Sequence, residues 1–412
     1  MNILIVCQYF WPESFRVNDV AASLRDRGHQ VTVLTGKPNY PDGTFFPGYR
    51  FSGICRETYH GVNVVRVPIF PRGQNSRLRL TLNFASFAIS GSLLAPFVTT
   101  GEYDGILVYA LSPIIQALPA FVLKMLGRGP VHIWLQDLWP ESLSATGAVR
   151  AKWLIRAVGF VTALIHRGAD QNLVSCAGFT ERLQAMGAAP ERIRYLPNYA
   201  EDFYGKQANV DKSAECEALV PQGFRVMFAG NIGEAQDFST ILAAAELLKE
   251  QKHIHWVIVG DGREFFWVRK ETKRRGLEET FHLAGRYPVE QMPQWFACAD
   301  VMLVTLRTDP IFALTLPTKV HSYMAASKPL IAALDGEAAR IVNESKCCLC
   351  VRTGDSAALA EAVLKASRMS AQKLQRLGRN GREYFDEHFD RQRVIFQLEE
   401  WMQSVAKASV RK

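Results

Sequence analysis

Short apolar runs alternate along the chain with segments in which apolar residues recur every three or four positions. In the first half, the apolar runs cover residues 3–7, 31–35, 63–67, 106–109, 131–135 and 172–174. Between the first two runs, Val17, Val20 and Leu24 share one face of a predicted helix. Strands that alternate with helices are joined by right-handed crossovers, so the pattern predicts a parallel, doubly wound sheet.

The same alternation begins again after residue 220. Its apolar runs are RVMFAG (225–230), IHWVIVG (254–260), TFHLAG (280–285), VMLVT (301–305) and PLIAAL (329–334). Residues 196–223, which separate the two series, are polar and contain Pro197, Pro221 and Gly223, as a domain boundary does. We therefore expect an α/β protein with two Rossmann-like, doubly wound parallel-sheet domains that face a cleft. The predicted domains are residues 1–197 and 198–390, and a C-terminal helix at 391–412 is expected to pack back on the first.

Composition narrows the class of protein. With 48% hydrophobic and 21% charged residues, the 412-residue chain has the composition of a folded globular protein. Its eight cysteines form no CxxC pair and no cluster at zinc spacing, which indicates reduced thiols in the cytosol. The one cysteine cluster lies in SKCCLCV (345–351), an apolar stretch that predicts a buried strand. We expect no metal and no disulfide.

Charge and hydropathy leave two interpretations of one N-terminal segment. Residues 1–200 hold 19 Lys/Arg and 12 Asp/Glu, whereas residues 201–412 hold 29 and 28. The apolar run 83–98 is short for a membrane span and contains Gly91 and Pro96. A basic turn with Arg72, Arg77 and Arg79 precedes a predicted helix that carries Phe84, Phe87, Leu93 and Phe97. This segment is either a surface that rests on anionic lipid headgroups or a core helix with a solvated basic turn.

Ligands bind to doubly wound sheets at the carboxyl ends of the strands. In the second half, two glycine loops follow strands there, one with Gly230, Asn231 and Gly233 and one with Gly260, Asp261 and Gly262. Glycines allow backbone N–H groups to approach a phosphate, and the following helix attracts it. Glycine is also common in strand-to-helix turns for purely structural reasons.

The segment LPTKVHSYM (316–324) opens a further predicted helix on the same side. Pro317 is tolerated at a helix start, Thr318 can cap, and Lys319 shares a face with Ser322 and Tyr323. Lys319 is expected to add its charge to the helix dipole, beside a leaving diphosphate. The chain contains no Asp-x-Asp for magnesium. We therefore expect the cations Lys319, Arg286 and Arg307 to act in its place, the alternative for Lys319 being an exposed helix-start lysine.

The order of these segments resembles the retaining glycosyltransferases of family four over nearly the whole chain. The resemblance is carried by ILIVCQYFWPE, LRDRGHQVTVLT, LVSCAGFTERLQAMGAAPERIRYLPNY, MFAGNIGEAQDF, VIVGDGRE and PTKVHSYMAASKPLIA. The motifs QYFWPE and LQDLWPES are similar to motifs of the subgroup that builds O-antigen, colanic acid and capsule repeat units, in particular to those of N-acetyl-L-fucosamine transferases.

This resemblance implies the GT-B fold and a UDP-sugar donor in the C-terminal domain. It also implies an acceptor sugar on a polyprenyl diphosphate met by the N-terminal domain, and a cytoplasmic protein peripheral on the inner face of the cytoplasmic membrane. No cofactor and no nucleic acid partner is expected.

The chain departs from the family pattern at the donor site. Asn231 and Gln236 stand where the family has an arginine and a lysine, and Leu314 and Ser322 stand where it has two glutamates. Recognition of the donor ribose or sugar would then fall to Ser322, Tyr323 or Glu337. Retention of the anomeric configuration rests on family membership alone.

On the acceptor side, VHIWLQDLWPES ends a predicted strand with Asp137, a carboxylate placed to accept a proton from an acceptor hydroxyl. It could instead hold the sugar or cap the next helix. Arg16, at the start of the first helix, would favour a diphosphate of the donor or the acceptor, and Glu13 could face the donor sugar. His132 lies inside a strand and is expected to pack.

Two other functions remain open. A non-hydrolysing UDP-sugar 2-epimerase uses the same two-domain architecture but needs no lipid-facing domain. A non-catalytic nucleotide-sugar-binding protein would share the fold, because fold does not determine function. A dehydrogenase is disfavoured, because CQYFWPESF after the first strand contains no GxGxxG.

Overall fold

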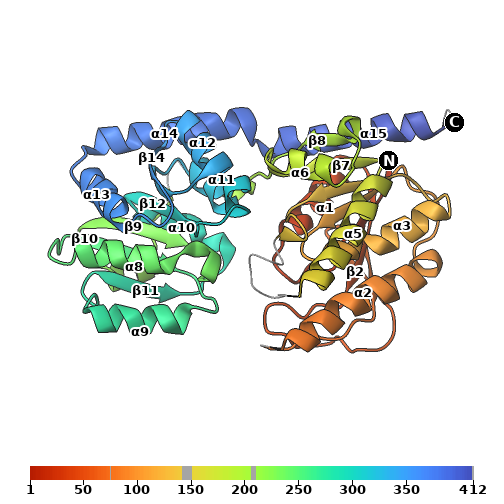
Figure 1. Ribbon diagram of the computed structural model, residues 1–412, viewed down its shortest axis with the longest axis horizontal. Helices are drawn as coiled ribbons and strands as arrows, with labels where there is room; N and C mark the ends of the chain where they lie inside the picture. The colour runs from red at the N-terminus through yellow and green to blue at the C-terminus, as the bar shows by residue number, and fades with distance from the viewer. Residues whose placement is uncertain (75, 142–150, 206–209, 411–412) are drawn as a thin grey trace. The chain divides into compact units, whose positions relative to one another are not determined.

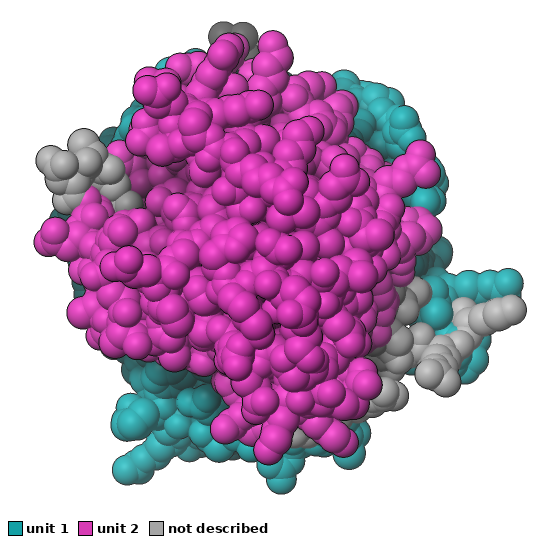
Figure 2. All heavy atoms as spheres, turned by 90° about the vertical axis from the view of Figure 1, so that its left-hand side faces the viewer, with its two compact units in different colours: residues 1–197, 392–412 teal, residues 198–391 magenta. Residues whose placement is uncertain are grey.

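The computed structural model describes residues 1–74, 76–141, 151–205 and 210–410 (Figure 1). The chain divides into two compact units: unit 1 comprises Met1–Pro197 with Gln392–Lys412, and unit 2 comprises Asn198–Arg391 (Figure 2). Each unit is built around one twisted sheet of mostly parallel strands with helices between them. The predicted α/β fold class is confirmed.

The sheet of unit 1 has eight strands in the order β3-β4-β2-β1-β5-β6-β7-β8. The strands are β1 (Asn2–Val6), β2 (Gln30–Gly36), β3 (Cys55–Tyr59), β4 (Val62–Val67), β5 (Gly105–Ala110), β6 (Val131–Leu135), β7 (Gln171–Val174) and β8 (Ile193–Tyr195). All pairs are parallel except β3 with β4, a hairpin closed by His60 and Gly61 at φ 46° and 78°. The apolar pattern did not predict β3, because its sequence CRETY has three polar residues in succession and only alternate residues are half-buried at the sheet edge.

The helices of unit 1 lie on both faces of its sheet. They are α1 (Arg16–Asp26), α2 (Arg77–Val98), α3 (Leu118–Met125), α5 (Lys152–Gly168), α6 (Phe179–Ala185) and α15 (Arg391–Val410), with 3-10 turns η1 (Ile114–Ala117) and η2 (Pro190–Arg192). Helix α1 crosses from β1 to β2, whereas α2, α3 and α5 cross in the opposite direction from β4 towards β7. Right-handed crossovers therefore place α2, α3 and α5 together on one face and α1 on the other (Figure 1).

Helix α15 packs within unit 1. Its Met402 is fully buried, and the Met402 methyl lies so close to Gly105 that a Cβ there would come within 2.5 Å. Glu399 accepts a 2.6 Å hydrogen bond from Arg27 Nε. Helix α15 comes after the last strand of unit 2 in the sequence, but these contacts make it part of unit 1.

The sheet of unit 2 has six parallel strands in the order β11-β10-β9-β12-β13-β14. They are β9 (Phe224–Ala229), β10 (Ile254–Val259), β11 (Phe281–Gly285), β12 (Val301–Thr305), β13 (Leu330–Ala333) and β14 (Cys348–Val351). The central strands are buried and mostly apolar because helices cover both faces of the sheet, although β9 and β10 include the buried Arg225 and His255. The cysteine-rich stretch forms β14, but its four residues are half-buried rather than buried, because β14 is the edge strand.

The helices of unit 2 alternate with these strands. They are α7 (Ala214–Leu219), α8 (Phe238–Leu247), α9 (Phe265–Arg275), α10 (Met292–Cys298), α11 (Thr318–Ala325), α12 (Gly336–Glu344), α13 (Ser356–Ser367) and α14 (Ala371–His388). The 3-10 turns are η3 (Asp202–Tyr204), η4 (Glu234–Gln236), η5 (Val289–Gln291) and η6 (Phe312–Leu314). A buried cluster of residues from β9, β10, α8 and α13 forms the core of one face.

Candidate functional site

The order of strands in unit 2 identifies its candidate binding edge. Strand β9 lies between β10 and β12, so the chain leaves β9 in one direction and later returns on its other side. The loops at the carboxyl ends of β9 and β12 diverge at such a switch point, which is where doubly wound sheets bind ligands. The loop after β9 contains Gly230 to Gly233, and the loop after β12 contains Arg307.

The two glycine loops pack against each other through their backbones. Gly230 N–H donates to Val259 O at 2.9 Å, and Ile232 N–H donates to Asp261 O at 2.8 Å. A Cβ on Gly260 would lie 1.9 Å from Gly230 O, and one on Gly262 would lie 2.2 Å from Ile232 O. Close backbone approach therefore explains Gly260 and Gly262 without a ligand.

The backbone at the tip of the β9 loop remains accessible. Gly230 and Asn231 are exposed, and Gly230 has a φ of 142°, which glycine alone adopts readily. The Asn231 amide packs against Gly233, whose Cβ would come within 2.7 Å of Asn231 Nδ2. Asp261, also exposed, accepts a 2.7 Å hydrogen bond from Gly262 N–H and so holds the second loop.

Lys319 reaches this loop from α11. Its Nζ donates to Gln236 Oε1 at 2.6 Å and lies 3.6 Å from the ring centroid of Phe228. A Cβ on Gly230 would be 3.3 Å from the same nitrogen. The ammonium is therefore fixed between an amide oxygen, an aromatic face and the backbone of the β9 loop, beside the switch point.

Burial lowers the pKa of Lys319 well below its ordinary value. The cause is desolvation, because an ammonium loses its hydration there, and no carboxylate among the described residues contributes to the shift. An anion bound beside Lys319 would supply the missing counter-charge. The site is thus electrostatically prepared for a negatively charged ligand.

The other residues of the α11 segment have different environments. Pro317 is the N-cap and Thr318, which is exposed, is the first helical residue; no side chain caps the helix, so the expectation that Thr318 caps it is wrong. The Tyr323 hydroxyl donates to Ala229 O at 3.0 Å and accepts from Ala229 N–H at 2.9 Å. Tyr323 therefore fastens α11 to β9, and Ser322 is also buried.

Two further cations and one carboxylate lie at the same edge of the sheet. Arg307 forms an ion pair with Glu234 and lies 3.9 Å from Asp309, so part of its charge is already compensated. Arg286 is exposed directly after β11, two strands away from β9. Glu337 is half-buried in the first turn of α12. Of the three, only Arg307 is brought close to the switch point.

In unit 1, Glu13 fastens the loops at the carboxyl edge of the sheet. It is 2% exposed; its Oε1 accepts from the N–H groups of Asn39 at 2.8 Å and Tyr40 at 2.7 Å, and its Oε2 accepts from Phe10 at 3.2 Å. Burial raises the pKa of Glu13 to about 7, although these hydrogen bonds favour the charged form. The carboxylate thus points into the loops that follow β1 and β2 rather than outward.

The first helix of unit 1 begins at Arg16, which is half-buried. The loop before it is held by Asn18, whose side chain accepts from Trp11 N–H at 2.9 Å and donates to Glu13 O at 2.7 Å. Behind the loop, the Asn83 side chain of α2 accepts from Gln8 Nε2 at 2.7 Å. Side-chain amides therefore position the loop that presents Arg16.

Asp137 lies at the carboxyl end of β6, next to the end of β5. Its Oδ2 accepts a 2.7 Å hydrogen bond from the Ser112 hydroxyl, which in turn accepts from Trp139 Nε1 at 2.9 Å. Burial raises the pKa of Asp137 above its ordinary value, and the Ser112 hydrogen bond opposes that rise. The neighbouring Gln136 has a buried Nε2 with no hydrogen-bond partner in the part of the chain that the structure describes. Carboxylate and amide together form a polar group able to bind a hydroxyl.

Sequence reasoning did not identify three of these participants. Phe228, Ser112 and Asn39 each reach the sites only through contacts between strands that are distant in sequence. The sequence marks Gln236 as a departure from the family pattern, and only the structure shows that it is the hydrogen-bond partner of Lys319. His132 is fully buried and bonds Gln171 at 3.2 Å, as expected for a packing residue.

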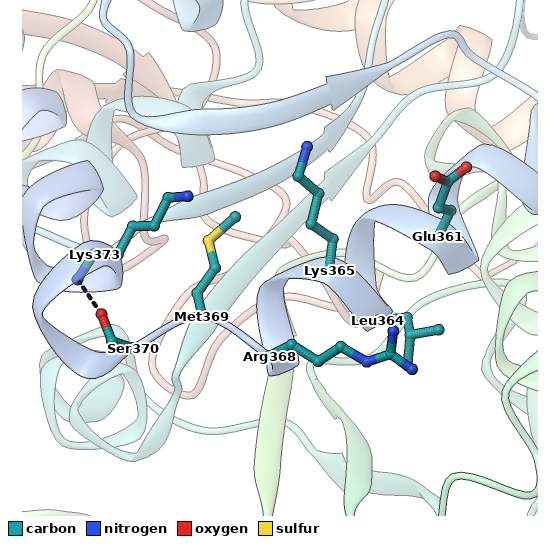
Figure 3. Close-up of a pocket in the computed structure, with 7 residues that line it drawn as sticks. All are labelled: Glu361, Leu364, Lys365, Arg368, Met369, Ser370 and Lys373. Carbon is teal, nitrogen blue, oxygen red and sulfur yellow. Dashed lines mark hydrogen bonds between the residues drawn. The ribbon is translucent and has the colours of Figure 1, made fainter.

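A surface hollow of about 500 Å³ lies elsewhere in unit 2 (Figure 3). It is lined by Glu361, Leu364, Lys365, Arg368, Met369, Ser370 and Lys373. Helix α13 follows β14 and runs back along the sheet, so its C-terminal end lies at the amino edge, opposite the switch point. This hollow is separate from the candidate site. Among the described residues, no group of three or more His, Cys, Asp or Glu could hold a metal ion.

Comparison with protein families assigns both units. Residues 14–199 match the family described as Glycosyl transferase 4-like domain, and residues 223–368 match the family described as Glycosyl transferases group 1. The chain belongs to the glycosyltransferases of GT-B type. The glycosyltransferase family stated as a resemblance is thereby confirmed at this level.

Curated relatives of the chain are described as glycosyltransferases, one of them in colanic acid biosynthesis. The chain is 24% identical over 338 residues to the putative colanic acid biosynthesis glycosyl transferase WcaI of Escherichia coli K12, covering 79% of this chain and 81% of that protein. It is 26% identical over 291 residues to the probable glycosyltransferase WbjE of Pseudomonas aeruginosa, covering 67% and 69%.

Solved structures share the fold at low identity. A sucrose-phosphate synthase from Thermosynechococcus elongatus superposes with a TM-score of 0.77 at 16% identity, covering 99% of each chain. Anabaena HepE, in complex with UDP and glucose, superposes with a TM-score of 0.71 at 19% identity, covering 98% of this glycosyltransferase and 100% of that chain.

Proposed function

We propose that this glycosyltransferase moves a sugar from a UDP-sugar to a sugar acceptor linked to polyprenyl diphosphate, in the assembly of an O-antigen or capsule repeat unit. The observation that carries the proposal is the Lys319 ammonium, held beside the exposed Gly230 backbone at the switch point of unit 2. HepE, a structural neighbour, is described in complex with UDP and glucose, which supports a nucleotide-sugar donor.

The donor diphosphate is proposed to bind the β9 loop and Lys319. As the bond from the anomeric carbon to the leaving oxygen breaks, negative charge accumulates on the diphosphate. A cation fixed beforehand in a poorly solvated place stabilises that developing charge more than the ground state. Gln236 is a positioning residue in this scheme, because its amide oxygen holds the ammonium in place. Lys319, with Arg307 nearby, takes the place of a metal ion, so transfer is proposed to be metal-independent.

The acceptor hydroxyl is proposed to bind at the carboxyl edge of the unit 1 sheet. Asp137 would accept its proton, because burial raises the pKa of this carboxyl towards the working range of a general base. Gln136 would donate to the same sugar with its otherwise unsatisfied amide nitrogen. Arg16 would bind the acceptor diphosphate, while Glu13 keeps the loops in position.

The sugar is proposed to be N-acetyl-L-fucosamine or a related amino sugar. This choice rests on the motifs QYFWPE and LQDLWPES. A role in polysaccharide assembly is supported by the relative described as a putative colanic acid biosynthesis glycosyl transferase, and a transferase activity by the relative described as a probable glycosyltransferase.

The test is a transfer assay with purified protein. UDP-N-acetyl-L-fucosamine and other UDP-amino sugars are incubated with a polyprenyl-diphosphate-linked acceptor in detergent, with and without EDTA, and the products are weighed by mass spectrometry. We expect one added sugar, equally in both conditions. Isomerised UDP-sugar without acceptor would instead establish an epimerase, and binding without any product would establish a non-catalytic protein. Loss of activity in EDTA would overturn metal independence.

A further inference from the structure

Three helices of unit 1 expose apolar side chains on one layer. On the outer faces of α2, α3 and α5 the exposed residues are Leu78, Leu82, Ile89, Leu93, Phe97, Leu118, Met125, Leu126, Trp153, Phe160 and Leu164, which we call the apolar layer. Phe97 and Met125 are 79% exposed and Trp153 is 72% exposed. Exposed apolar surface on this scale marks a docking surface rather than ordinary solvent-exposed protein.

These helices are neighbours, so the apolar residues form one surface. A Cβ on Gly91 of α2 would meet Pro119 of α3 at 2.7 Å, and one on Gly168 of α5 would meet Phe121 of α3 at 2.9 Å. Helix α3 therefore lies between α2 and α5 (Figure 1). The sequence leaves α2 as either a lipid-facing or a core helix. In the structure Phe87 is fully buried whereas Leu93 and Phe97 are exposed, so one face of the helix packs in the core and the other is open to solvent.

Helix α2 packs against the sheet of unit 1 along its length, which excludes that it crosses a membrane. Leu78–Val98 is long and apolar enough to do so by length and composition, and 33% of it is buried. However, α2 connects β4 to β5 of one sheet, and its inner residues Asn83, Phe87 and Ala95 are fully buried. The exposed stripe can therefore lie along a bilayer surface, as an interfacial helix does.

The charges on this layer match an anionic surface. The sequences of α2, α3 and α5 contain no Asp and no Glu, while Arg79, Arg156 and Arg167 on these helices are exposed. Helix α1, on the other face of the sheet, carries Asp19 and Asp26. Apolar side chains interspersed with arginines are attracted to anionic headgroups. A dimer of two copies that contact each other through this face would bring their arginines together, and the like charges would repel.

One end of the layer adjoins the loops proposed to bind the acceptor. Helix α2 begins at the carboxyl edge of the sheet, where exposed Phe51 and Phe70 pack at 4.8 Å between ring centroids. Arg72 N–H donates to Asn39 Oδ1 at 2.8 Å, and Asn39 N–H donates to Glu13. A membrane that touches Phe51 and Phe70 would therefore lie beside these loops.

We propose that the apolar layer docks flat on an anionic phospholipid membrane, and that its Phe51 and Phe70 end brings a lipid-linked acceptor to the carboxyl edge of the unit 1 sheet. The second part rests on the proposed function, whereas the docking itself does not. The protein would in this way be held at the membrane surface without crossing the bilayer.

The test is flotation of the full-length protein with vesicles. Vesicles of phosphatidylcholine alone are compared with vesicles that also contain phosphatidylglycerol and cardiolipin. The wild type is expected to float with anionic vesicles and to stay behind with neutral ones. Variants Leu93→Glu with Phe97→Glu, and separately Arg79→Glu with Arg156→Glu, are expected to lower the partition coefficient at least tenfold. The matched control is Phe266→Glu on α9 of unit 2, where Phe266 is 77% exposed.

Three outcomes would overturn the docking. The variants float like the wild type; the wild type ignores anionic vesicles as completely as neutral ones; or sedimentation finds a dimer that Phe97→Glu dissociates and that does not float. Calorimetry with UDP in solution separates this proposal from the proposed function, because the surface variants are expected to bind UDP as the wild type does. If the wild type floats with anionic vesicles and the surface variants do not, but none of these proteins binds UDP, the donor site fails and the docking surface stands.

Discussion

The ammonium of Lys319 lies 2.6 Å from the side-chain oxygen of Gln236, which is 83 positions earlier in the chain. Gln236 ends the turn η4 after β9, and Lys319 lies in the first turn of α11 after β12. The two meet because β9 and β12 are neighbouring strands whose carboxyl ends share one edge. The family that the chain resembles has a lysine at position 236; here that position is Gln236, and Lys319 reaches it from another helix.

Removal of this ammonium is expected to weaken nucleotide binding. Lys319→Ala should lower the affinity for UDP at least tenfold, about 1.4 kcal/mol, because the diphosphate loses its fixed counter-charge. Isothermal titration calorimetry measures the change. Lys270→Ala, at an exposed lysine of α9, is the control and should bind like the wild type. Equal affinity in the two variants would remove Lys319 from the donor site.

Exchange of the two residues should restore binding. In the double variant Gln236→Lys with Lys319→Gln, the ammonium and the amide trade places within one hydrogen bond. We expect UDP affinity within about threefold of the wild type, well above that of Lys319→Gln alone. If the double variant binds as weakly as the single variant, the ammonium must come from α11, and charge near Gln236 does not suffice.

The transfer rate should depend on pH through Asp137. Only the charged carboxylate accepts a proton, so kcat/KM should fall as the pH decreases through the raised pKa of Asp137. Ser112→Ala removes a hydrogen bond that lowers this pKa, and should therefore move the acidic limb to higher pH. Asp137→Asn should reduce kcat by about 100-fold or more and abolish that limb.

A pH-rate profile with the lipid-linked acceptor measures these effects. Thr308→Ala, which removes a hydroxyl at the edge of the other sheet, is the control and should leave the acidic limb in place. If Asp137→Asn raises KM but keeps the limb, Asp137 binds the sugar and another group accepts the proton.

The stability of unit 1 should depend on pH through Glu13. Burial raises the pKa of Glu13 from 4.5 to about 7 in the folded state, so the folded protein favours the protonated carboxyl. This stabilisation is complete below about pH 4.5 and is lost as the pH rises through about 7. Relative to Glu13→Gln, which stays neutral, the wild type should lose free energy of unfolding over that range. The difference is a few kcal/mol at most, because one pKa unit corresponds to about 1.4 kcal/mol.

Urea denaturation at a series of pH values, followed by circular dichroism, measures this difference. Glu191→Gln, at an exposed glutamate of unit 1, is the control and should run parallel to the wild type. A constant offset between wild type and Glu13→Gln at every pH would show that the three backbone hydrogen bonds keep the pKa near its ordinary value.

Much of the fold follows from local pattern. Buried strands such as GILVYA are continuous apolar runs because helices cover both faces of the sheet. The amphipathic α1 is marked by Val17, Val20 and Leu24. The edge strand β3 was not predicted, because alternate residues of CRETY are exposed to solvent. The predicted strand ends also indicated where to look for candidate site residues, because the loops that follow parallel strands lie at one edge of the sheet.

Sequence by itself determined that two parallel-sheet units form, that Asp137 and the glycine loops follow strands, and that Lys319 stands at the start of a helix. The spacing of apolar residues that predicts these elements is a local property of the chain. Only the tertiary structure decided that Lys319 meets Gln236 and Phe228 and that Gly260 and Gly262 serve backbone packing. It also decided that α2 buries Phe87 and exposes Phe97. These outcomes depend on strand order and on which face of a helix meets the sheet, and both are set by contacts between segments far apart in sequence.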